Sequence, residues 1–224
     1  MPATKVVVNL ADESPYDVRI GAGVLAKLGV HVRKHPELER VERVLVVTDD
    51  NVAPLYLADA KAALAQAGFR VSDVTVAAGE GSKSVEVAAE IWEAMAQLSL
   101  GRDCLVVALG GGVVGDLAGF AAASWLRGVE FIQIPTTLLA MVDSSVGGKT
   151  GVDIPQGKNL VGAFWQPSLV VCDTDMLSLL PAETFADGMA EVIKYGAIFD
   201  RELFEQLERG GQALAGPGAL EGII

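Results

Sequence analysis

A glycine-rich stretch follows the apolar run Cys104–Leu109 and reads Gly110-Gly111-Gly112-Val113-Val114-Gly115-Asp116. Its glycines fit the pattern G-x-G-x-x-G at a strand-to-helix turn. Glycine allows positive φ and lets the backbone approach a ligand, and free N–H groups at a helix start stabilise a pyrophosphate. We therefore predict a dinucleotide site at this turn. The alternative is a turn whose glycines serve packing alone.

The acidic residue that binds the ribose in such sites is not where the standard pattern puts it. That pattern has an acid about twenty residues further on, at the end of the next strand. Glu130 is the nearest acid, but it begins a predicted strand and so lies at the opposite edge of the sheet. Asp49, at the C-terminal end of the run Arg43–Thr48, is the better ribose partner. We expect a Rossmann-like fold that departs from the standard fingerprint.

A second chemical cluster lies in the segment 135–167, whose second half is polar and rich in glycine. Lys149 and Lys158 supply positive charge, and Asn159 supplies neutral hydrogen bonds, which together suit a phosphate. Gly148-Lys149-Thr150 resembles the end of a P-loop, but G-x-x-x-x-G-K-S/T requires glycine where this chain has Asp143. We predict a functional loop that binds phosphate without being a P-loop. Lysines that are merely solvated are the alternative.

The elements that must position these residues alternate between strands and helices. Predicted helices follow Asn51, a candidate N-cap, as far as Gly68, and follow Ser84 as far as Gly101. Their alternation with continuous apolar strands predicts an α/β fold with a doubly wound, mostly parallel sheet. The predicted strands are Lys5–Leu10, Arg43–Thr48, Val71–Val76, Cys104–Leu109, Phe131–Ile134 and Leu169–Cys172.

The pattern changes near Pro181, after which Glu183–Tyr195 and Arg201–Leu207 are predicted to be helices with no strand between them. We therefore predict a Rossmann-like cofactor-binding domain over residues 1–180. Residues 181–224 would begin an all-helical domain that carries metal and substrate ligands. The chain ends in an apolar stretch without a helix cap, which we interpret as a truncation.

Composition limits the partners. The net charge of −12 disfavours nucleic acid and anionic membranes because like charges repel, so a phosphorylated ligand needs a local basic cluster. No apolar stretch is long enough to span a bilayer, and the N-terminus does not resemble a secretory signal. Cys104 and Cys172 lie in apolar runs and are predicted to be buried, unpaired strand residues, which favours a cytoplasmic location.

Three long stretches in order resemble the 3-dehydroquinate synthase family: GGGVVGDLAGFAAASWLRG, PTTLLAMVDSSVGGKTGVDIPQGKNLVGAFWQP and GMAEVIKYG. The similarity extends to TDDNVAPLY and GEGSKS, and so covers most of the chain. It implies an NAD-dependent lyase of the shikimate pathway. Such an enzyme converts 3-deoxy-arabino-heptulosonate 7-phosphate to 3-dehydroquinate and phosphate.

The resemblance also implies residue roles. Substrate would be bound by Asn159 and Lys158, and its phosphate by Arg127. Asp143, Lys149 and Lys194 would be catalytic, with Lys194 contacting a carboxylate, and Glu191 would be a metal ligand. The implied NAD contacts are Asp49, Asn51, Glu80, Lys83, Gly111, Gly112, Val113, Asp116, Thr136, Thr137 and Lys158.

The metal ligands are incomplete in this sequence. The family holds Zn²⁺, or Co²⁺, with one glutamate and two histidines, whereas the only histidines here are His31 and His35. They are spaced i,i+4 and could share a metal, but we interpret them as surface residues of a basic, solvated stretch. We expect the metal histidines beyond residue 224, and therefore expect this chain alone to be inactive.

Three other functions stay open at this point. The first is another sugar-phosphate cyclase, and the second is a metal-dependent polyol or glycerol-phosphate dehydrogenase with the same glycine turn. The stretch VDSSVGGKTGVDIPQGKN favours the dehydroquinate branch over both. The third is an NAD-binding module without catalytic activity. A small phosphorylated sugar acid is the expected substrate, and a homodimer is the assembly that the resemblance implies.

Overall fold

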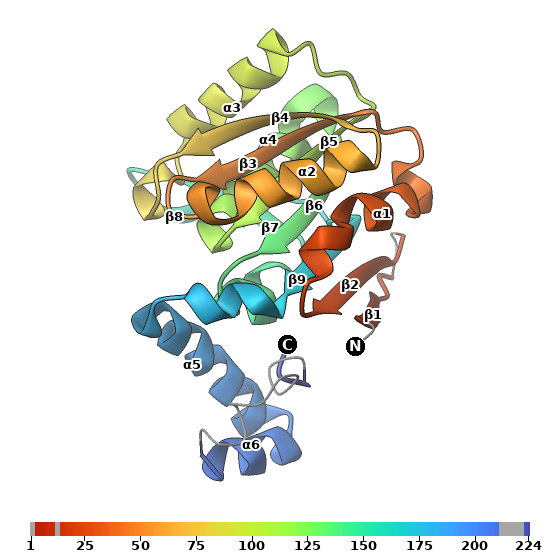
Figure 1. Cartoon of the computed structure of the whole chain (residues 1–224). Helices are drawn as coiled ribbons and strands as arrows, with labels where there is room; N and C mark the ends of the chain where they lie inside the picture. The colour runs from red at the N-terminus through yellow and green to blue at the C-terminus, as the bar shows by residue number, and fades with distance from the viewer. Residues whose placement is uncertain (1–2, 12–13, 211–221) are drawn as a thin grey trace.

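A computed structural model describes residues 3–11, 14–210 and 222–224 (Figure 1). Six strands of its main sheet run parallel to their neighbours, and β1 alone pairs antiparallel, with β2. The fold is Rossmann-like, as the alternation of strands and helices predicts. The strands of this sheet are β1 (Thr4–Val8), β2 (Tyr16–Gly21), β3 (Arg43–Asp49), β4 (Arg70–Val76), β5 (Cys104–Gly110), β6 (Glu130–Pro135) and β9 (Leu169–Asp173).

The strand order is β1-β2-β9-β6-β5-β3-β4. The chain therefore runs outward from β3 to β4 and then returns across β3 to form β5. Such a reversal opens a crevice beyond the carboxyl ends of the two strands between which it occurs, and ligands of α/β proteins bind there. The crevice between β3 and β5 is where Asp49 and the glycine-rich turn come together.

Helices cover both faces of the sheet because its strands are apolar on both sides. Val44 and Val46 of β3 belong to one apolar cluster, with residues of α1 (Leu28–Arg33) and α2 (Ala58–Gln66). The alternate residues Leu45 and Val47 belong to a second cluster. That cluster includes Ile91 of α3 (Val85–Gln97) and residues of α4 (Gly112–Ser124). Successive strand residues thus point to opposite helical layers.

Two helix signals have different outcomes. Helix α3 begins after Ser84 as predicted, and Ser84 caps it, because its hydroxyl accepts from the backbone N–H of Val87 at 3.2 Å. The prediction of Asn51 as a cap is wrong. The Asp49 carboxylate accepts from the backbone N–H groups of Asn51 and Val52, each at 2.9 Å, and the turns Ala53–Leu57 and α2 follow. Gly68 ends the helix in a left-handed conformation, at φ 85°.

The second half of the predicted loop 135–167 is largely a β-hairpin, formed by β7 (Lys149–Ile154) and β8 (Gly157–Phe164). It lies apart from the main sheet and packs on α4. Its glycines permit close approach: a Cβ at Gly162 would lie 2.1 Å from the carbonyl oxygen of Thr150. A Cβ at Gly119 of α4 would lie 2.4 Å from Cγ2 of Thr150. The sequence pattern missed this hairpin because glycine and polar residues replace the usual alternation.

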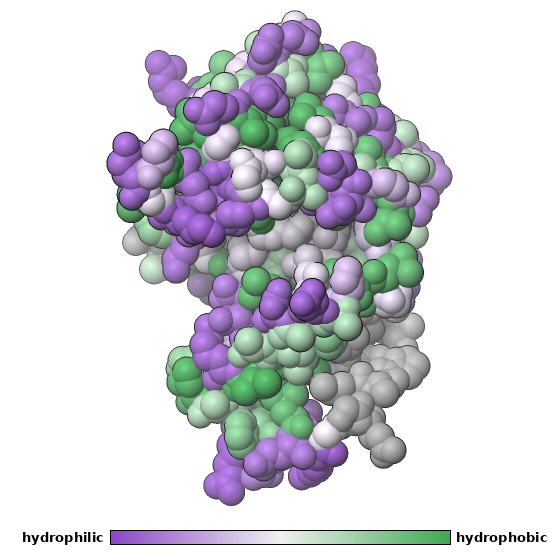
Figure 2. Space-filling view, turned by 90° about the vertical axis from the view of Figure 1, so that its left-hand side faces the viewer, coloured by the Kyte–Doolittle hydropathy of each residue, from purple (hydrophilic) through white to green (hydrophobic). Residues whose placement is uncertain are grey.

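Two helices follow the sheet, α5 (Ala182–Ile198) and α6 (Arg201–Glu208), near the predicted positions. They project below the sheet in Figure 1. Val192 of α5 nevertheless joins the apolar cluster of the sheet. Hydrophobic side chains are visible on the lower part of Figure 2, and the exposed ones include Ile193 and Ile198 of α5 and Phe199, which directly follows it. The division into domains 1–180 and 181–224 stays a prediction.

Both cysteines are free and buried, as expected. Burial raises the pKa of the Cys104 thiol to about 11 and that of the Cys172 thiol to about 12, so both stay protonated and unreactive near neutral pH. Among the described residues, no helix is long and apolar enough to cross a membrane.

His31 and His35 lie at the surface as interpreted, where they line an open pocket, but they are less solvated than the exposed Arg33 and Lys34 between them. Both are half-buried, and neither Nε2 of His31 nor Nδ1 of His35 has a hydrogen-bond partner among the described residues. Burial, followed by the charges of Arg19, Lys27 and Lys34, lowers the pKa of His31. His31 lies in α1 beside the buried Val32, and His35 directly precedes the turn Pro36–Leu38, whose Leu38 is buried. A list of charged neighbours does not reveal this packing.

We predict that stability falls as pH is lowered from about 6.5, the ordinary histidine pKa, through the lower pKa of folded His31. The reason is that the unfolded chain then binds the proton more readily than the folded one. His31→Gln should reduce this slope in urea unfolding measured between pH 8 and 5. The difference between variant and wild type should be constant above pH 7.5, and an unchanged slope would contradict the prediction.

Candidate functional site

The glycine-rich turn joins β5 to α4 at the carboxyl edge of the sheet. None of Gly110, Gly111 and Gly112 has positive φ, so the expectation that these glycines supply positive φ at the turn is wrong. The glycines serve close approach instead. A Cβ at Gly111 would lie 3.2 Å from Cγ2 of Thr137, and one at Gly112 would lie 3.1 Å from Oγ of Ser144. Side chains here would crowd the segment that follows β6.

The start of α4 is suited to an anion. Gly111 is the N-cap and provides no side-chain cap, so the first N–H groups of the helix remain available. The Ser144 hydroxyl beside Gly112 is buried and has no hydrogen-bond partner among the described residues. Free backbone donors and an unpartnered hydroxyl at a crevice fit a pyrophosphate group. Val113, predicted to contact the cofactor, lies in this first turn.

Two aspartates shape the loops beside the turn. Asp49 ends β3 and holds the backbone of Asn51 and Val52, as described above. Asp50 accepts from the backbone N–H of Ala78 at 3.0 Å and so fastens the loop after β4. The predicted ribose ligand Asp49 therefore lies at the crevice but also orders its own loop through one carboxylate oxygen. Asn51 is exposed.

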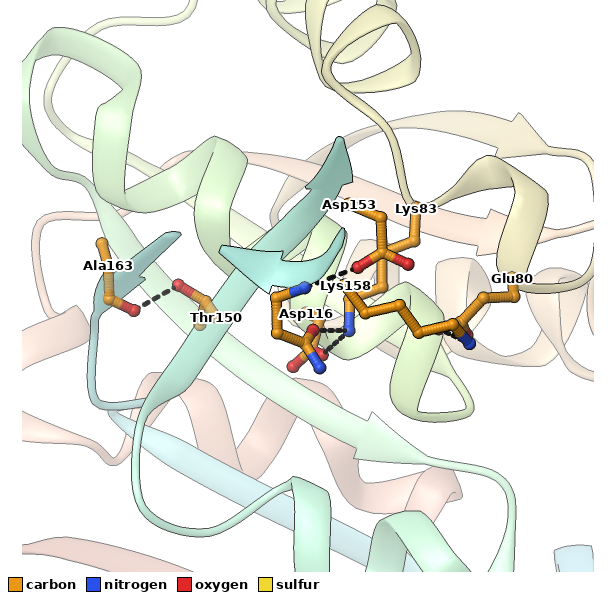
Figure 3. A network of polar contacts seen from close by, with 8 residues as sticks. Glu80, Lys83, Asp116, Thr150, Asp153, Lys158 and Ala163 are labelled. Carbon is orange, nitrogen blue, oxygen red and sulfur yellow. Dashed lines mark hydrogen bonds and ion pairs between the residues drawn. The ribbon is translucent and has the colours of Figure 1, made fainter. Parts of the chain in front are cut away.

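A buried lysine joins three separate segments. The side chain of Lys83 is 6% exposed, and its Nζ lies 2.5 Å from Oδ2 of Asp116 and 2.5 Å from Oδ1 of Asn159 (Figure 3). Lys83 comes from the segment between β4 and α3, Asp116 from α4 and Asn159 from β8. In this structure Lys83 thus links three segments of the site. The resemblance implies instead that Lys83 contacts the cofactor directly.

Asp116 carries the electrostatic cost of this arrangement. Burial raises its pKa, Lys83 opposes that shift, and the carboxylates of Glu80 and Asp153 add to it. Lys158 and Glu80 form an exposed ion pair with Nζ and Oε1 3.0 Å apart, which raises the pKa of Lys158. Two lysines and two carboxylates, in the pairs Lys83–Asp116 and Lys158–Glu80, therefore lie in this part of the site.

The two predicted threonines follow β6 and face the glycine turn. Thr136 is buried, and its N–H donates to the carbonyl of Gly110 at 3.0 Å. Thr137 packs against Gly111, and its Oγ1 accepts from the N–H of Ala140 at 3.2 Å. Both therefore lie at the predicted cofactor turn.

A cavity of about 620 Å³ adjoins the α4 start. Its lining includes Asp116, Asp143, Lys149 and Asn159, four of the predicted site residues, which come from different segments. Lys149 is exposed and has no ion-pair partner among the described residues. Lys149 and Thr150 lie in β7 and do not begin a helix, so the P-loop reading is excluded.

Helix α5 lies close to Asp143 as well. Glu191 and Lys194 form an ion pair one turn apart, and the Tyr195 hydroxyl lies 3.4 Å from Oδ1 of Asp143. The hydrogen bond that Lys194 donates to Glu191 is the first cause of the raised pKa of Lys194, and Asp143 also contributes. The described residues contain no group of three histidine, cysteine or acidic side chains that could hold a metal, so Glu191 lacks partner ligands there.

Arg127 does not line the cavity, although the resemblance implies that it binds the substrate phosphate. It is exposed, has φ 68°, and lies beyond the C-terminal end of α4. The thirteen residues of α4 span roughly 20 Å, and they separate Arg127 from the glycine turn. Sequence reasoning also missed Ser144 and Asp153, which lie within the quoted stretch VDSSVGGKTGVD but were given no role.

A family model described as "3-dehydroquinate synthase N-terminal" matches residues 73–187. The chain belongs to the 3-dehydroquinate synthase family. The 3-dehydroquinate synthase of Symbiobacterium thermophilum is 55% identical over 214 residues, which are 95% of this chain and 59% of that protein. The chain thus spans less than two thirds of the length of the curated relatives it matches.

Two solved structures of related synthases are also similar to this chain. One is 2-epi-5-epi-valiolone synthase from Streptomyces hygroscopicus subsp. jinggangensis 5008 with NAD+ and Zn2+ bound. Its TM-score is 0.81 at 32% identity, over 96% of this chain and 60% of that one. Another is 2-deoxy-scyllo-inosose synthase complexed with carbaglucose-6-phosphate, NAD+ and Co2+. Its TM-score is 0.78 at 29% identity, over 85% of this chain and 50% of that one.

We predict that Lys83→Met destabilises this chain by about 2–3 kcal/mol at neutral pH, because it leaves the Asp116 carboxylate partly buried without its cation. Asp116→Asn should also destabilise, and the double variant should lose about 1–3 kcal/mol less than the sum. Urea unfolding measures all three. The exposed pair Lys61–Asp73 is the control, with a coupling below about 1 kcal/mol. Additive losses at Lys83 and Asp116 would contradict the prediction.

Proposed function

We propose that this chain binds NAD at the crevice between β3 and β5 and contributes the cofactor half of a 3-dehydroquinate synthase. The observation that carries the proposal is the convergence of Asp116, Asp143, Lys149 and Asn159 on one cavity beside the uncapped start of α4. Membership of the family supports the same reaction. In that reaction 3-deoxy-arabino-heptulosonate 7-phosphate yields 3-dehydroquinate and inorganic phosphate.

For the cofactor, the first-turn N–H groups of α4 would bind the pyrophosphate. Asp49 would bind a ribose hydroxyl through its second carboxylate oxygen, since Oδ1 already accepts two backbone N–H groups. When bound, NAD supplies reversible hydride removal from a secondary alcohol. Lys83 would act indirectly, by holding Asp116 and Asn159 at the edge of the cavity.

For the substrate, the side chains of the cavity bind and orient a phosphorylated sugar acid. Lys149 would stabilise negative charge on the phosphate or on a developing oxyanion. Asn159 would donate to a hydroxyl, and Asp143 would accept one. Lys194, beside Asp143, would bind the carboxylate. These local cations overcome the repulsion expected from a chain of net charge −12.

The solved relatives contain Zn2+ or Co2+. We propose that Glu191 contributes one ligand to such a metal in this protein. Because the described residues do not form a metal site, we assign no step of the reaction to the ion. The expectation that this chain alone is inactive follows from the same shortage of ligands and remains a prediction.

Among the alternatives, another sugar-phosphate cyclase is the nearer one, since the two solved cyclases are 32% and 29% identical to this chain. The 55% identity to a 3-dehydroquinate synthase favours the dehydroquinate reaction. We also propose a homodimer, as the resemblance implies, and a cytoplasmic location, which the buried free thiols of Cys104 and Cys172 support. Arg127, exposed outside the cavity of its own chain, is available for such an interface.

We predict that Gly112→Val weakens NAD binding by about ten-fold or more, because each ten-fold change in Kd requires only 1.4 kcal/mol and the added side chain occupies the approach to α4. Isothermal titration of the purified chain with NAD measures the change. Gly222→Ala is the control, since a Cβ there meets no atom of the described residues within 4 Å. Undiminished binding by Gly112→Val would exclude the turn as the NAD site.

A second experiment separates the reaction classes. The protein that contains this chain, supplied with the heptulosonate phosphate, NAD and Zn²⁺, should release phosphate without accumulating NADH. Lys149→Met should slow this release by about a hundred-fold or more, as loss of an oxyanion-stabilising group does. Steady accumulation of NADH would favour a dehydrogenase. Tight NAD binding without any turnover by that protein would favour the inactive module.

A further inference from the structure

The β7–β8 hairpin carries three of the predicted substrate and cofactor ligands, Lys149, Lys158 and Asn159. It is not part of the seven-stranded sheet, so sheet hydrogen bonds do not position it. A few specific contacts must therefore fix its turn relative to the cofactor crevice. The residue at which these contacts meet is Asp153, near the end of β7.

The backbone of Asp153 fastens the hairpin to the segment before α3. Its N–H donates to the carbonyl of Lys83 at 2.7 Å, and Asp153 forms an isolated parallel bridge with Ser84. That segment, Glu80–Ser84, contains two predicted NAD contacts. The hairpin turn and the predicted cofactor loop thus share one junction, which Figure 3 shows with Asp153 beside Lys83.

The side chain of Asp153 contacts β8. Its Oδ1 accepts from the backbone N–H of Asn159 at 2.7 Å. Asn159 has φ 56°, a left-handed conformation that costs free energy in residues other than glycine and that asparagine tolerates better than most. Held in this conformation, Asn159 places its side-chain oxygen 2.5 Å from Nζ of Lys83.

We infer that Asp153 is a positioning residue of this site: its carboxylate holds Asn159 in the left-handed conformation, and its backbone locks the hairpin to the Glu80–Ser84 segment. The substrate side and the cofactor side of the site are thereby set relative to each other. The inference rests on the proposed function, because it assigns Asp153 a role in that same site. Asp153 itself lies outside the cavity lining, so it acts through Asn159 and Lys83.

The charge of Asp153 is a secondary part of this role. It adds to the pKa increase that burial causes in Asp116, and it also raises the pKa of Lys158. The hydrogen bond to Asn159 needs only an acceptor oxygen, which asparagine also possesses. Asparagine at position 153 should therefore preserve the geometry while removing the charge.

The test compares Asp153→Ala with Asp153→Asn by titration of the purified chain with NAD. Asp153→Ala should raise the NAD Kd about five- to ten-fold, roughly 1–1.4 kcal/mol by the usual conversion, because Asn159 loses the carboxylate that holds its left-handed conformation and with it the fixed contact to Lys83. Asp153→Asn should return the Kd to within about two-fold of wild type. Asp73→Ala, an exposed aspartate substitution outside the site, should leave the Kd unchanged.

A second set of variants separates positioning from general stability. Asn159→Gly accepts φ 56° without help, so adding Asp153→Ala to it should change the NAD Kd by less than about two-fold. Independent, additive effects would show that Asp153 does not act through Asn159 and would overturn the inference. So would an Asp153→Asn variant as weak as Asp153→Ala, or an Asp153→Ala variant that binds NAD like wild type.

These outcomes remain distinct from failure of the proposed function. A wild-type chain that binds no NAD overturns the proposed function, and the inference falls with it. A wild-type chain that binds NAD, with Asp153 variants indistinguishable from it, overturns the inference alone. Thermal unfolding of each variant, measured without NAD, identifies any loss of binding that comes from unfolding.

Discussion

The ammonium group of Lys83 lies out of water between Asp116 and Asn159, and the geometry of the site depends on this contact. A buried cation is costly unless its partners are within hydrogen-bonding distance, so the three segments that meet there can move little relative to one another. They are the loop after β4, the second turn of α4 and the start of β8. The cofactor turn and the substrate cavity share α4, so the same contact aligns both.

Close packing of small residues makes this alignment possible. Gly119 lets β7 approach α4 at Thr150, and Gly115 lets Gln133 of β6 approach the same helix, since a Cβ there would lie 2.7 Å from the Gln133 amide oxygen. The hairpin therefore lies against the helix that begins at the predicted pyrophosphate site. At the core of the site, the glycines thus allow neighbouring strands and α4 to approach each other closely. Left-handed conformations occur at its periphery, as at Gly79, Gly147 and Gly148.

The cations of the site are mostly held by carboxylates. Lys83 pairs with Asp116, Lys158 with Glu80, and Lys194 with Glu191, whereas Lys149 has no such partner among the described residues. An acidic protein can keep several lysines near one cavity in this way without strong mutual repulsion. A phosphorylated ligand would meet Lys149 directly and would compete with Glu80 and Glu191 for the two exposed lysines. Lys83, being buried, would keep its partners.

Local patterns in the sequence determined the alternation of strands and helices, the glycine turn after β5, the start of a helix after Ser84 and the buried cysteines, because each depends on neighbours within a few residues. The resemblance placed the site residues in order along the chain.

Only the tertiary structure decided that Lys83 is buried between Asp116 and Asn159, that residues 149–164 form a hairpin, and that Asp153 holds Asn159. It also decided that Arg127 lies away from the cavity and that His31 is half-buried. These features depend on contacts between segments up to 76 residues apart, such as Lys83 and Asn159. Their energies arise only when packing removes water from both partners, which no local pattern in the sequence records.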